Sequence, residues 1–262
     1  MYDLKALDNA IKNILALRCE DISLVFLDLN NTSNYIYINE NKIFPSASTI
    51  KVLILAEALN EVLNGKLSLD APIEVKTSDK VPYSILTSLT NNKYPLIDLL
   101  TLMIISSDNT ASNILIDLLT MDSINNYGQS IGLKNTSLKR KMMDSKAVQR
   151  GMDNLTSALD MLTLFKKIYN HELLNPKMCD LILKILGNNT DKEVLLRYLD
   201  ADIRCAHKTG DLSNLNHDIG VFKTKTSEYI LGVFVRNADF NYVAKDLIGK
   251  VSKIVYDFLT CI

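Results

Sequence analysis

The sequence is poor in several residue types, and each scarcity removes a class of protein. Tryptophan is absent, and the 262 residues include only three histidines, five prolines and nine glycines. The three histidines (His171, His207 and His217) lack the spacing of a metal site, and no Walker loop or dinucleotide fingerprint occurs. We therefore expect neither a metal nor a cofactor. No internal repeat, low-complexity tract or flexible linker is evident.

Cysteine is also scarce. Four cysteines, Cys19, Cys179, Cys205 and Cys261, are scattered without Cys-x-x-Cys or metal-ligand spacing. Free and mostly buried thiols are the expected state, which favours a reducing compartment. The first residues are charged and follow a helical pattern rather than that of a signal peptide. We expect a protein that is either cytoplasmic or secreted with its leader removed.

Excess charge and long apolar runs are missing as well. The formal net charge is −1 and no basic run occurs, so a nucleic-acid partner is not expected. No apolar stretch reaches the roughly 20 residues that a membrane-spanning helix needs. What the chain does have is 47% apolar and 23% charged residues, the balance of a globular protein with a sizeable core. We expect a monomer that binds a small molecule.

The hydrophobic pattern divides the chain into three parts. Residues 1–65 predict an amphipathic helix over 3–17, a hairpin of strands over 22–29 and 35–38, and a helix from Ser48 to about Gly65. Residues 66–200 predict helices around an irregular segment over 134–155. These helices are residues 95–104, 110–119, 123–131, 157–170, 176–186 and 192–199. Residues 201–262 predict strands over 203–209, 219–222 and 229–235, followed by a helix over about 240–260.

This order of elements predicts an α/β protein of the α+β kind, with two lobes in a single domain, 1–262. Both chain ends would build one antiparallel sheet flanked by the terminal helices, which makes a sheet lobe of residues 1–65 and 201–262. Residues 66–200 would form an all-helical lobe. A cleft between the lobes is the expected place for a binding site.

Ser48 and Lys51 are the first candidates for chemistry. A helix that begins at Ser48 places both side chains on one face, near the positive end of the helix dipole. A serine hydroxyl becomes a nucleophile when a neighbouring base takes its proton, and a lysine with a lowered pKa can be that base. A helix cap followed by a solvated lysine is the alternative reading of this pair.

Two further motifs favour the chemical reading. Ser107-Asp108-Asn109 lies between two apolar helices, and Lys208-Thr209-Gly210 ends an apolar strand, where Gly210 lets a ligand approach the backbone. Ser-x-x-Lys, Ser-Asp-Asn and Lys-Thr-Gly occur together in class A β-lactamases and penicillin-binding proteins. Over nearly its whole length the chain resembles the class A β-lactamase-like serine hydrolases of the penicillin-recognising group.

The resemblance implies a role for each motif residue. Ser48 would attack an amide or β-lactam carbonyl, with Lys51 as base and Ser107 as the donor of a proton to the leaving nitrogen. The remaining residues would bind the substrate or brace the site. Asn109 would hold the substrate's side-chain amide and help to position Lys51. Lys208 would supply positive charge near Ser107, and Thr209 would hydrogen-bond a substrate carboxylate. Asp211 with Ser48 would hold the oxyanion through backbone N–H groups, and Asp108 would brace its loop. Tyr83 falls where the family has a tyrosine at the cleft mouth; a surface tyrosine without a role is the alternative.

The irregular segment departs from the family pattern. Class A β-lactamases carry a glutamate there that activates the water for hydrolysis of the acyl-enzyme. In this sequence Arg140 matches the loop arginine, but Met142 stands at the glutamate position and Lys146 at that of a water-holding asparagine. A thioether cannot accept a proton from water, so the usual route of deacylation would be lost. Asp144 is the nearest loop carboxylate; it would either replace the glutamate or cap a turn.

Two other expectations concern the loop and the next strand. Asp153 stands where it would pair with Arg140 and clamp the loop. The family's basic residue on the strand after Gly210 is not evident. His207 should face away from Lys208, since neighbouring residues of a strand point to opposite faces. Asp218 would repel a substrate carboxylate if it faced the cleft.

These motifs and departures leave several functions open. We expect an enzyme acylated at Ser48 by a β-lactam or a related amide or ester, with weak or absent deacylation. The competing activities are β-lactam hydrolysis and a peptidase, esterase or transpeptidase reaction on a peptidoglycan-like substrate. A non-hydrolysing sensor of β-lactams or peptidoglycan fragments is an alternative from another class. A scaffold without activity would have no need of the complete set of motif residues.

Overall fold

The two ends of the chain build one five-stranded antiparallel sheet. The computed structural model describes residues 2–16 and 18–260, so Leu17 and Cys261 lie outside the described residues. The sheet runs in the order β2-β1-β9-β8-β7. Its strands are β1 (Asp21–Asp28), β2 (Tyr35–Ile38), β7 (Arg204–Leu212), β8 (Leu215–Lys223) and β9 (Glu228–Arg236). The N-terminal hairpin thus pairs with the C-terminal meander through β1 and β9, as expected.

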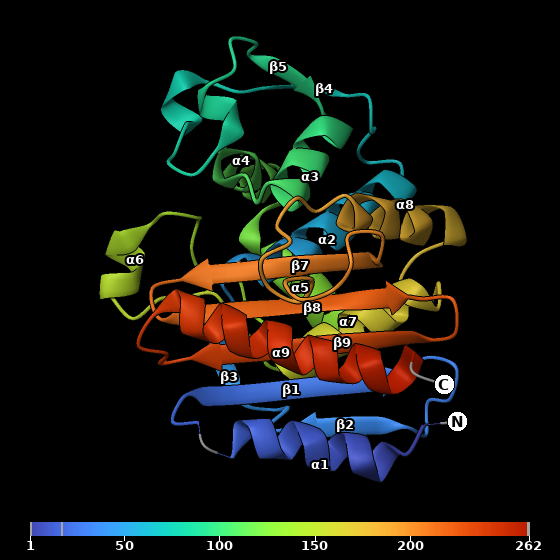
Figure 1. Ribbon diagram of the computed structural model, residues 1–262. Coiled ribbons are helices and arrows are strands. Elements are labelled where there is room, and N and C mark those ends of the chain that lie inside the picture. The colour runs from blue at the N-terminus through green and yellow to red at the C-terminus, as the bar shows by residue number, and fades with distance from the viewer. Residues whose placement is uncertain (1, 17, 261–262) are drawn as a thin grey trace.

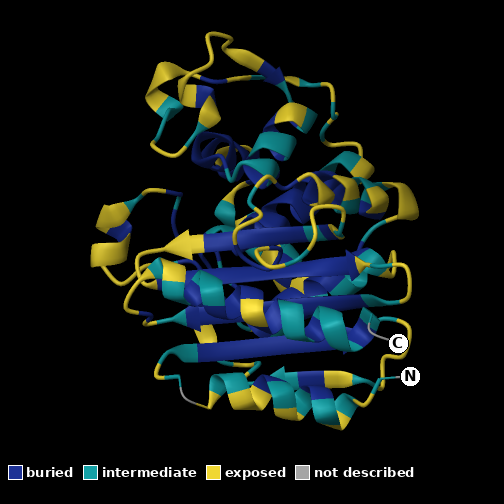
Figure 2. Ribbon diagram, in the orientation of Figure 1, coloured by how far each residue is buried: buried dark blue, intermediate teal, exposed yellow. Residues whose placement is uncertain are grey.

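The sheet separates two apolar cores. Strand β1 alternates between them, with Leu24 and Phe26 facing one and Val25 and Leu27 the other, as the two-residue period of a strand requires. Helices α1 (Leu4–Leu15) and α9 (Asn241–Thr260) cover the first face. Because both faces are covered, β1, β8 and β9 are buried except at their ends (Figure 2).

The opposite core joins the sheet to the helical lobe. The helices of residues 66–200 are α3 (Leu96–Ile105), α4 (Asn109–Leu119), α5 (Met121–Ser130), α6 (Ser145–Gln149), α7 (Ala158–Tyr169) and α8 (Pro176–Gly187). Of these, α7 and α8 contact the sheet. Helix α2 (Lys51–Leu63) is buried over nine consecutive residues, Lys51 to Leu59, and contacts α3, α4, α5 and α8. The two-lobed fold predicted from the order of elements is confirmed (Figure 1).

Short strands and turns complete the fold, and one predicted helix is wrong. The short strands β3 (Ile43–Pro45) and β6 (Leu155–Ser157) pair with each other, as do β4 (Pro72–Glu74) and β5 (Lys93–Pro95). Single 3₁₀ turns are η1 (Ala47–Ile50), η2 (Thr77–Asp79) and η3 (Ile85–Thr87). Residues 192–199, predicted as a helix, form turns instead. The backbone N–H of Leu195 donates to the buried carboxylate of Asp218 at 3.0 Å, a tertiary contact that overrides the helical pattern.

Two smaller features also bear on the expectations. Cys19, Cys179 and Cys205 carry free thiols, and the latter two are buried. No helix within the described ranges is long and apolar enough to cross a membrane.

Candidate active site

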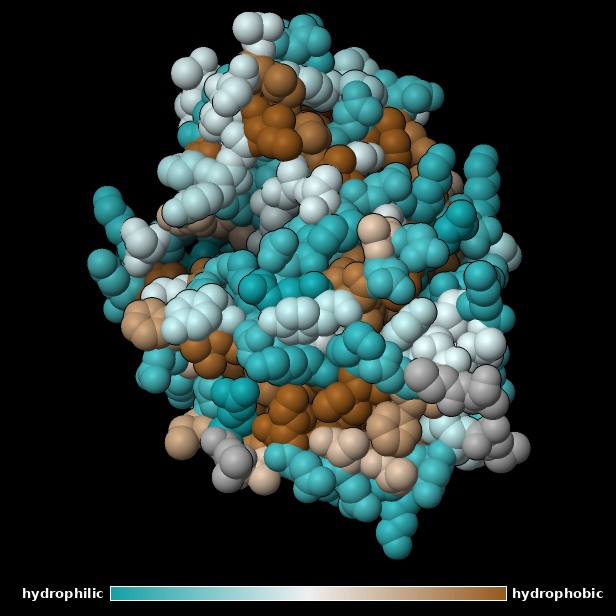
Figure 3. Space-filling view, viewed as in Figure 1, coloured by the Kyte–Doolittle hydropathy of each residue, from teal (hydrophilic) through white to brown (hydrophobic). Residues whose placement is uncertain are grey.

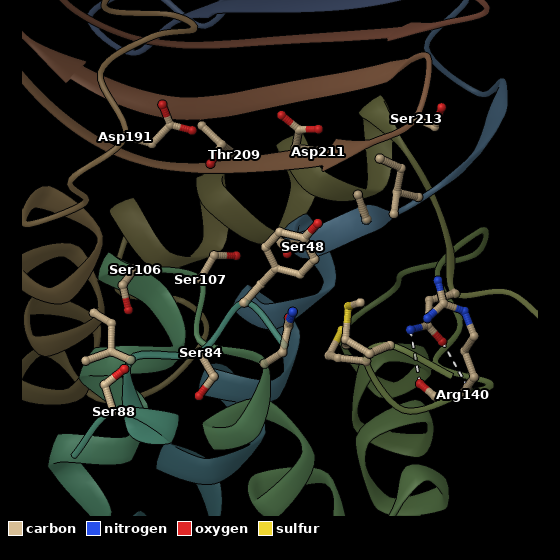
Figure 4. Close-up of a pocket in the computed structure, with 18 residues that line it drawn as sticks. Ser48, Ser84, Ser88, Ser106, Ser107, Arg140, Asp191, Thr209, Asp211 and Ser213 are labelled. Carbon is tan, nitrogen blue, oxygen red and sulfur yellow. Dashed lines mark hydrogen bonds between the residues drawn. The ribbon is translucent and has the colours of Figure 1, made fainter. Parts of the chain in front are cut away.

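A cavity of about 890 Å³ lies between the two lobes. Figure 3 shows the molecule hollowed between the upper, helical lobe and the sheet. The cavity is lined by the Ser48 turn, the loops over 83–88 and 106–109, the loop over 140–154, and the end of β7 with Asp191 beside it. Every sequence motif therefore contributes to one cavity (Figure 4).

Ser48 lies in a 3₁₀ turn rather than at the start of an α-helix. Turn η1 runs directly into α2, and the backbone N–H of Lys51 donates to the carbonyl of Ser48. The turn is anchored at its start, because Ser46 donates its N–H to the carbonyl of Asn154 at 2.7 Å. Thr49 and Ile50 are buried while Ser48 is half-buried and lines the cavity, so the hydroxyl is accessible to a substrate.

Lys51 is fully buried, and its ammonium contacts the loop that carries Ser107. Nζ donates to the Ser107 carbonyl at 2.6 Å, to Ser107 Oγ at 3.1 Å and to Asn109 Oδ1 at 2.9 Å. Burial, with the neighbouring charge of Lys208, lowers the pKa of Lys51 well below its ordinary value. A lysine with a depressed pKa can lose a proton near neutral pH and then accept one from a hydroxyl.

The Ser107 hydroxyl lies between two buried lysines. Its Oγ is 3.1 Å from Lys51 Nζ and 3.2 Å from Lys208 Nζ. Burial lowers the pKa of Lys208 to about 8. Ser107 has φ +55°, an uncommon left-handed backbone that aims its side chain into the cavity. A hydroxyl in this place can take a proton from one side and deliver it to the other.

Asp108 braces its loop, as the sequence predicted. Its buried carboxylate accepts from the hydroxyl of Ser84 at 2.8 Å and from the backbone N–H groups of Leu86 at 3.1 Å and Ala111 at 2.9 Å. Tyr83, next to Ser84, is 80% exposed with φ +56° and lines the cavity. The structure therefore places Tyr83 at the cleft mouth.

Gly210 is required for packing as well as for access. A Cβ on Gly210 would lie 3.0 Å from Ala47 Cβ and 3.2 Å from the carbonyl oxygen of Ser46, closer than most Cβ contacts, so the Ser48 turn would have to shift by a few tenths of an ångström. The glycine thus lets β7 approach the Ser48 turn, a role beyond the ligand approach expected from sequence. Thr209 and Asp211 on either side of it line the cavity.

The irregular segment supplies a wall without a free carboxylate. The predicted clamp is present, because Arg140 Nε donates to Asp153 at 2.8 Å. Met142 is buried and lines the cavity, and Asn113 fixes its backbone through bonds of 2.7 and 3.1 Å to its N–H and carbonyl. Asp144 does not line the cavity; its carboxylate caps α6 by accepting from the N–H of Ala147 at 2.9 Å.

Strand β8 supplies no cation to the cavity. His217 is fully buried, its Nε2 lies 3.0 Å from the carbonyl of Pro45, and burial lowers its pKa to about 4, so the ring is neutral at pH 7. Asp218 faces His207, whose Nδ1 is 3.0 Å from its carboxylate, on the opposite side of the strand from Lys208. His207 therefore faces away from Lys208, as predicted, and Asp218 does not face the cleft.

Sequence reasoning missed one residue that supports the cavity wall and one that lines the cavity. Asn113, which holds the backbone of Met142, was noted only as a continuation of the Ser107 motif, although its i+4 spacing from Asn109 already placed it on the same helical face. Asp191 lines the cavity from the position directly before the segment predicted as a helix, and no motif marks it. Among the residues that the structure describes, no cluster of three or more histidine, cysteine, aspartate or glutamate side chains could hold a metal ion.

The comparisons with known proteins agree with this geometry. A family model described as "Beta-lactamase enzyme family" matches residues 6–259. The chain belongs to the beta-lactamase enzyme family. Among curated members, beta-lactamase VEB-1 of Pseudomonas aeruginosa is 25% identical over 267 residues, covering 95% of this chain and 88% of its own.

Solved structures extend the family likeness to the whole fold. A beta-lactamase from Sphaerobacter thermophilus superimposes with a TM-score of 0.90 at 24% identity, covering 99% of both chains. PBP-A superimposes with a TM-score of 0.90 at 28% identity, covering 99% of this chain and 97% of its own. A leucine-to-glutamate variant of PBP-A has been solved as an acyl-enzyme complex with penicillin G, with a TM-score of 0.88.

Proposed function

We propose that the protein is a serine acyl-transfer enzyme that is acylated at Ser48 by β-lactams, or by related amides and esters, and deacylates slowly. The observation that carries this proposal is the placement of Ser107 Oγ within 3.2 Å of both buried lysine ammonium groups beside an accessible Ser48. The relation to PBP-A, a variant of which forms an acyl-enzyme with penicillin G, supports a β-lactam as acyl donor.

In the proposed acylation these groups act in sequence. Neutral Lys51 accepts the Ser48 proton while Oγ bonds to the substrate carbonyl carbon. The backbone N–H groups of Ser48 and Asp211 stabilise the oxyanion that develops. The carbon–nitrogen bond then breaks, and Ser107 donates its proton to the leaving nitrogen while Lys51 returns the first proton to Ser107. Lys208 and Thr209 bind the substrate carboxylate at the edge of β7.

Deacylation lacks an equivalent set of groups. The cavity-lining members of the 140–154 loop are Arg140, Met142, Met143 and Asn154, none of which is a carboxylate. The carboxylates that line the cavity, Asp191 and Asp211, come from other segments, and Asp211 is bonded to Asn241 at 2.7 Å and to Lys245 at 3.0 Å. Water at the ester therefore lacks a general base on the loop face.

A second reaction of the same acyl-enzyme is transfer to an amine, as in a peptidase or transpeptidase acting on peptidoglycan-like peptides. The observation that favours it is the Met142 wall, because an incoming amine brings its own nucleophile and depends less on a base that activates water. A sensor that stays acylated is the limiting case of slow release. Adding a D-amino acid to the acyl-enzyme separates transfer from hydrolysis and from a sensor that stays acylated. If the D-amino acid speeds the loss of the adduct, the acyl group is transferred to its amine.

The test of acylation is intact mass spectrometry after mixing with penicillin G. We expect a mass increase of one penicillin per chain that persists for minutes, and no increase for Ser48→Ala. Thr49→Ser, a change at the buried neighbour of Ser48, is the matched control and should acylate like the parent. An unmodified parent protein at millimolar penicillin would reject the proposal.

A further inference from the structure

The segment from Asn188 to Leu195 is the first half of the connection from α8 to β7, and it contacts both α3, which leads to Ser107, and β7, which carries Lys208. It is not helical, and Asp191 within it lines the cavity. Figure 4 shows this segment's Asp191 beside Thr209, across the cavity from Ser106 and Ser107. Contacts to α3 and to β7, rather than a local sequence pattern, set the backbone conformation of this segment.

Asn189 attaches the segment to the strand that carries Lys208. Its side chain is only 3% exposed. The amide Nδ2 donates to the carbonyl of His207 at 3.1 Å, and Oδ1 accepts from the backbone N–H of Asp191 at 3.0 Å. The carbonyl of His207 belongs to the peptide bond that joins His207 to Lys208, so this contact holds the backbone directly before the lysine.

Thr190 attaches the same segment to the opposite wall. Its backbone N–H and its hydroxyl both donate to the carbonyl of Ile105, at 3.0 and 2.7 Å. Ile105 is the last residue of α3 and stands two positions before Ser107. Two consecutive residues, Asn189 and Thr190, therefore link the backbone beside Ser107 to the backbone beside Lys208.

A third contact fixes the far end of the segment. The carboxylate of Asp218, fully buried in β8, accepts from the N–H of Leu195 at 3.0 Å and from Nδ1 of His207 at 3.0 Å. The segment is thus attached to β7 and α3 at its start and to β8 at its far end.

We propose that Asn189 and Thr190 are positioning residues that set the distance between Ser107 and Lys208, and so the delivery of the proton to the leaving nitrogen. This inference rests on the proposed acylation of Ser48. Ser107 Oγ lies 3.2 Å from Lys208 Nζ, and the two residues come from different lobes. A displacement of about 1 Å between reacting groups costs up to about 10²-fold in rate.

The pKa of Lys208 reports on the distance between Ser107 and Lys208, because it depends on burial and on the neighbouring charges. The charged groups around Lys208 are Lys51 from α2, Asp191 from the linking segment and Asp218 from β8, which lies on the opposite side of the strand. Burial is the largest cause of its lowered pKa of about 8, and both aspartates oppose that shift. When α3 and β7 move apart, water reaches the Lys208 ammonium, and the pKa of Lys208 rises toward the ordinary lysine value.

The experiment compares four variants with the parent. Asn189→Ala removes the contact to β7, and Thr190→Val removes the hydroxyl contact to α3, whereas Thr190→Ser retains it. Asn188→Ala, an exposed neighbour, is the matched control. Acylation by penicillin G is measured per folded molecule between pH 6 and 10. In parallel, an NMR titration of the lysine side chains follows Lys208 without any substrate.

We expect Asn189→Ala to acylate about 10- to 100-fold more slowly, with the alkaline limb of its pH profile and the Lys208 titration both moved to higher pH. Thr190→Val should show the same changes to a smaller degree, and Thr190→Ser and Asn188→Ala should match the parent. Unchanged acylation and an unchanged Lys208 titration in Asn189→Ala would overturn the inference. If the parent itself is not acylated, the proposed function fails, and the Lys208 titration alone still decides the positioning role.

Discussion

The cavity wall that holds Ser48 differs from the wall formed by the 140–154 loop in the groups that it presents to a substrate. On the wall that holds Ser48, the buried lysines, Ser107 and Asn109 form a connected polar network. On the wall formed by the 140–154 loop, the thioethers of Met142 and Met143 line the cavity, and Arg140 is bonded to Asp153. The first wall is built for proton transfer and the second is not. This contrast is the basis of our proposal that the ester at Ser48 forms readily and is hydrolysed slowly.

The largest effect is expected from removing the base of the polar wall. Lys51→Met should slow acylation by about 10³-fold, because the Ser48 proton loses its acceptor. Lys66→Met, a surface lysine just beyond α2, is the matched control and should leave the rate unchanged. Stopped-flow mixing with a β-lactam measures both rates; a Lys51→Met protein that acylates at the parental rate would remove Lys51 from the mechanism.

Converting the apolar wall into a polar one should have the next largest effect. Met142→Glu places a carboxylate on the cavity wall with its backbone held by Asn113, and should speed deacylation by about 10²-fold. Met143→Glu, at the exposed neighbour that also lines the cavity, is the control for added charge and should deacylate slowly. The decay of the penicillin adduct by intact mass gives both rates. Equal decay in the two variants would contradict the role given to Met142.

The pH dependence of acylation separates the two lysines of the polar wall. Lys51 must be neutral to accept a proton, so the rate falls as the pH drops below its depressed pKa. Lys208 must be charged to bind a carboxylate, so the rate also falls as the pH rises above its pKa of about 8, by about tenfold per pH unit. Second-order acylation rates across pH 5–10 should give a bell. A rate that keeps rising above pH 9 would remove Lys208 from the binding of substrate.

The smallest effect is expected from Asp144→Asn. Asparagine is as good a helix N-cap as aspartate, and Asp144 contacts α6 rather than the cavity. Both the turnover of a chromogenic cephalosporin and the melting temperature should stay at the parental values. A loss of turnover in Asp144→Asn would show that this carboxylate takes over the activation of water.

The polar wall was predictable from sequence because its motifs impose their own geometry. Ser48 and Lys51 are one turn apart, and Ser107 and Lys208 each lie in a short motif at the end of an apolar element. The pairing of Arg140 with Asp153 was also predicted and is confirmed. Strand alternation alone placed His207 and Lys208 on opposite faces.

The contacts between distant segments were not predictable. The sequence pattern of residues 192–199 favoured a helix, but the Asp218 carboxylate holds the N–H of Leu195 and turns the chain away from one. The attachment of Met142 to Asn113 joins residues 29 positions apart. The strands β3 to β6 are three residues long each, which is too short for the two-residue alternation of a strand to be recognised in the sequence.

The most direct test of the central claim mixes the protein with a chromogenic cephalosporin in excess and follows colour with time. The account predicts a rapid burst of about one equivalent of colour per chain, followed by a slow steady phase, while intact mass shows nearly all chains acylated. Ser48→Ala should give neither burst nor adduct. Rapid linear colour with no burst and no adduct would contradict the account, because the loop wall would then support hydrolysis as fast as the polar wall supports acylation.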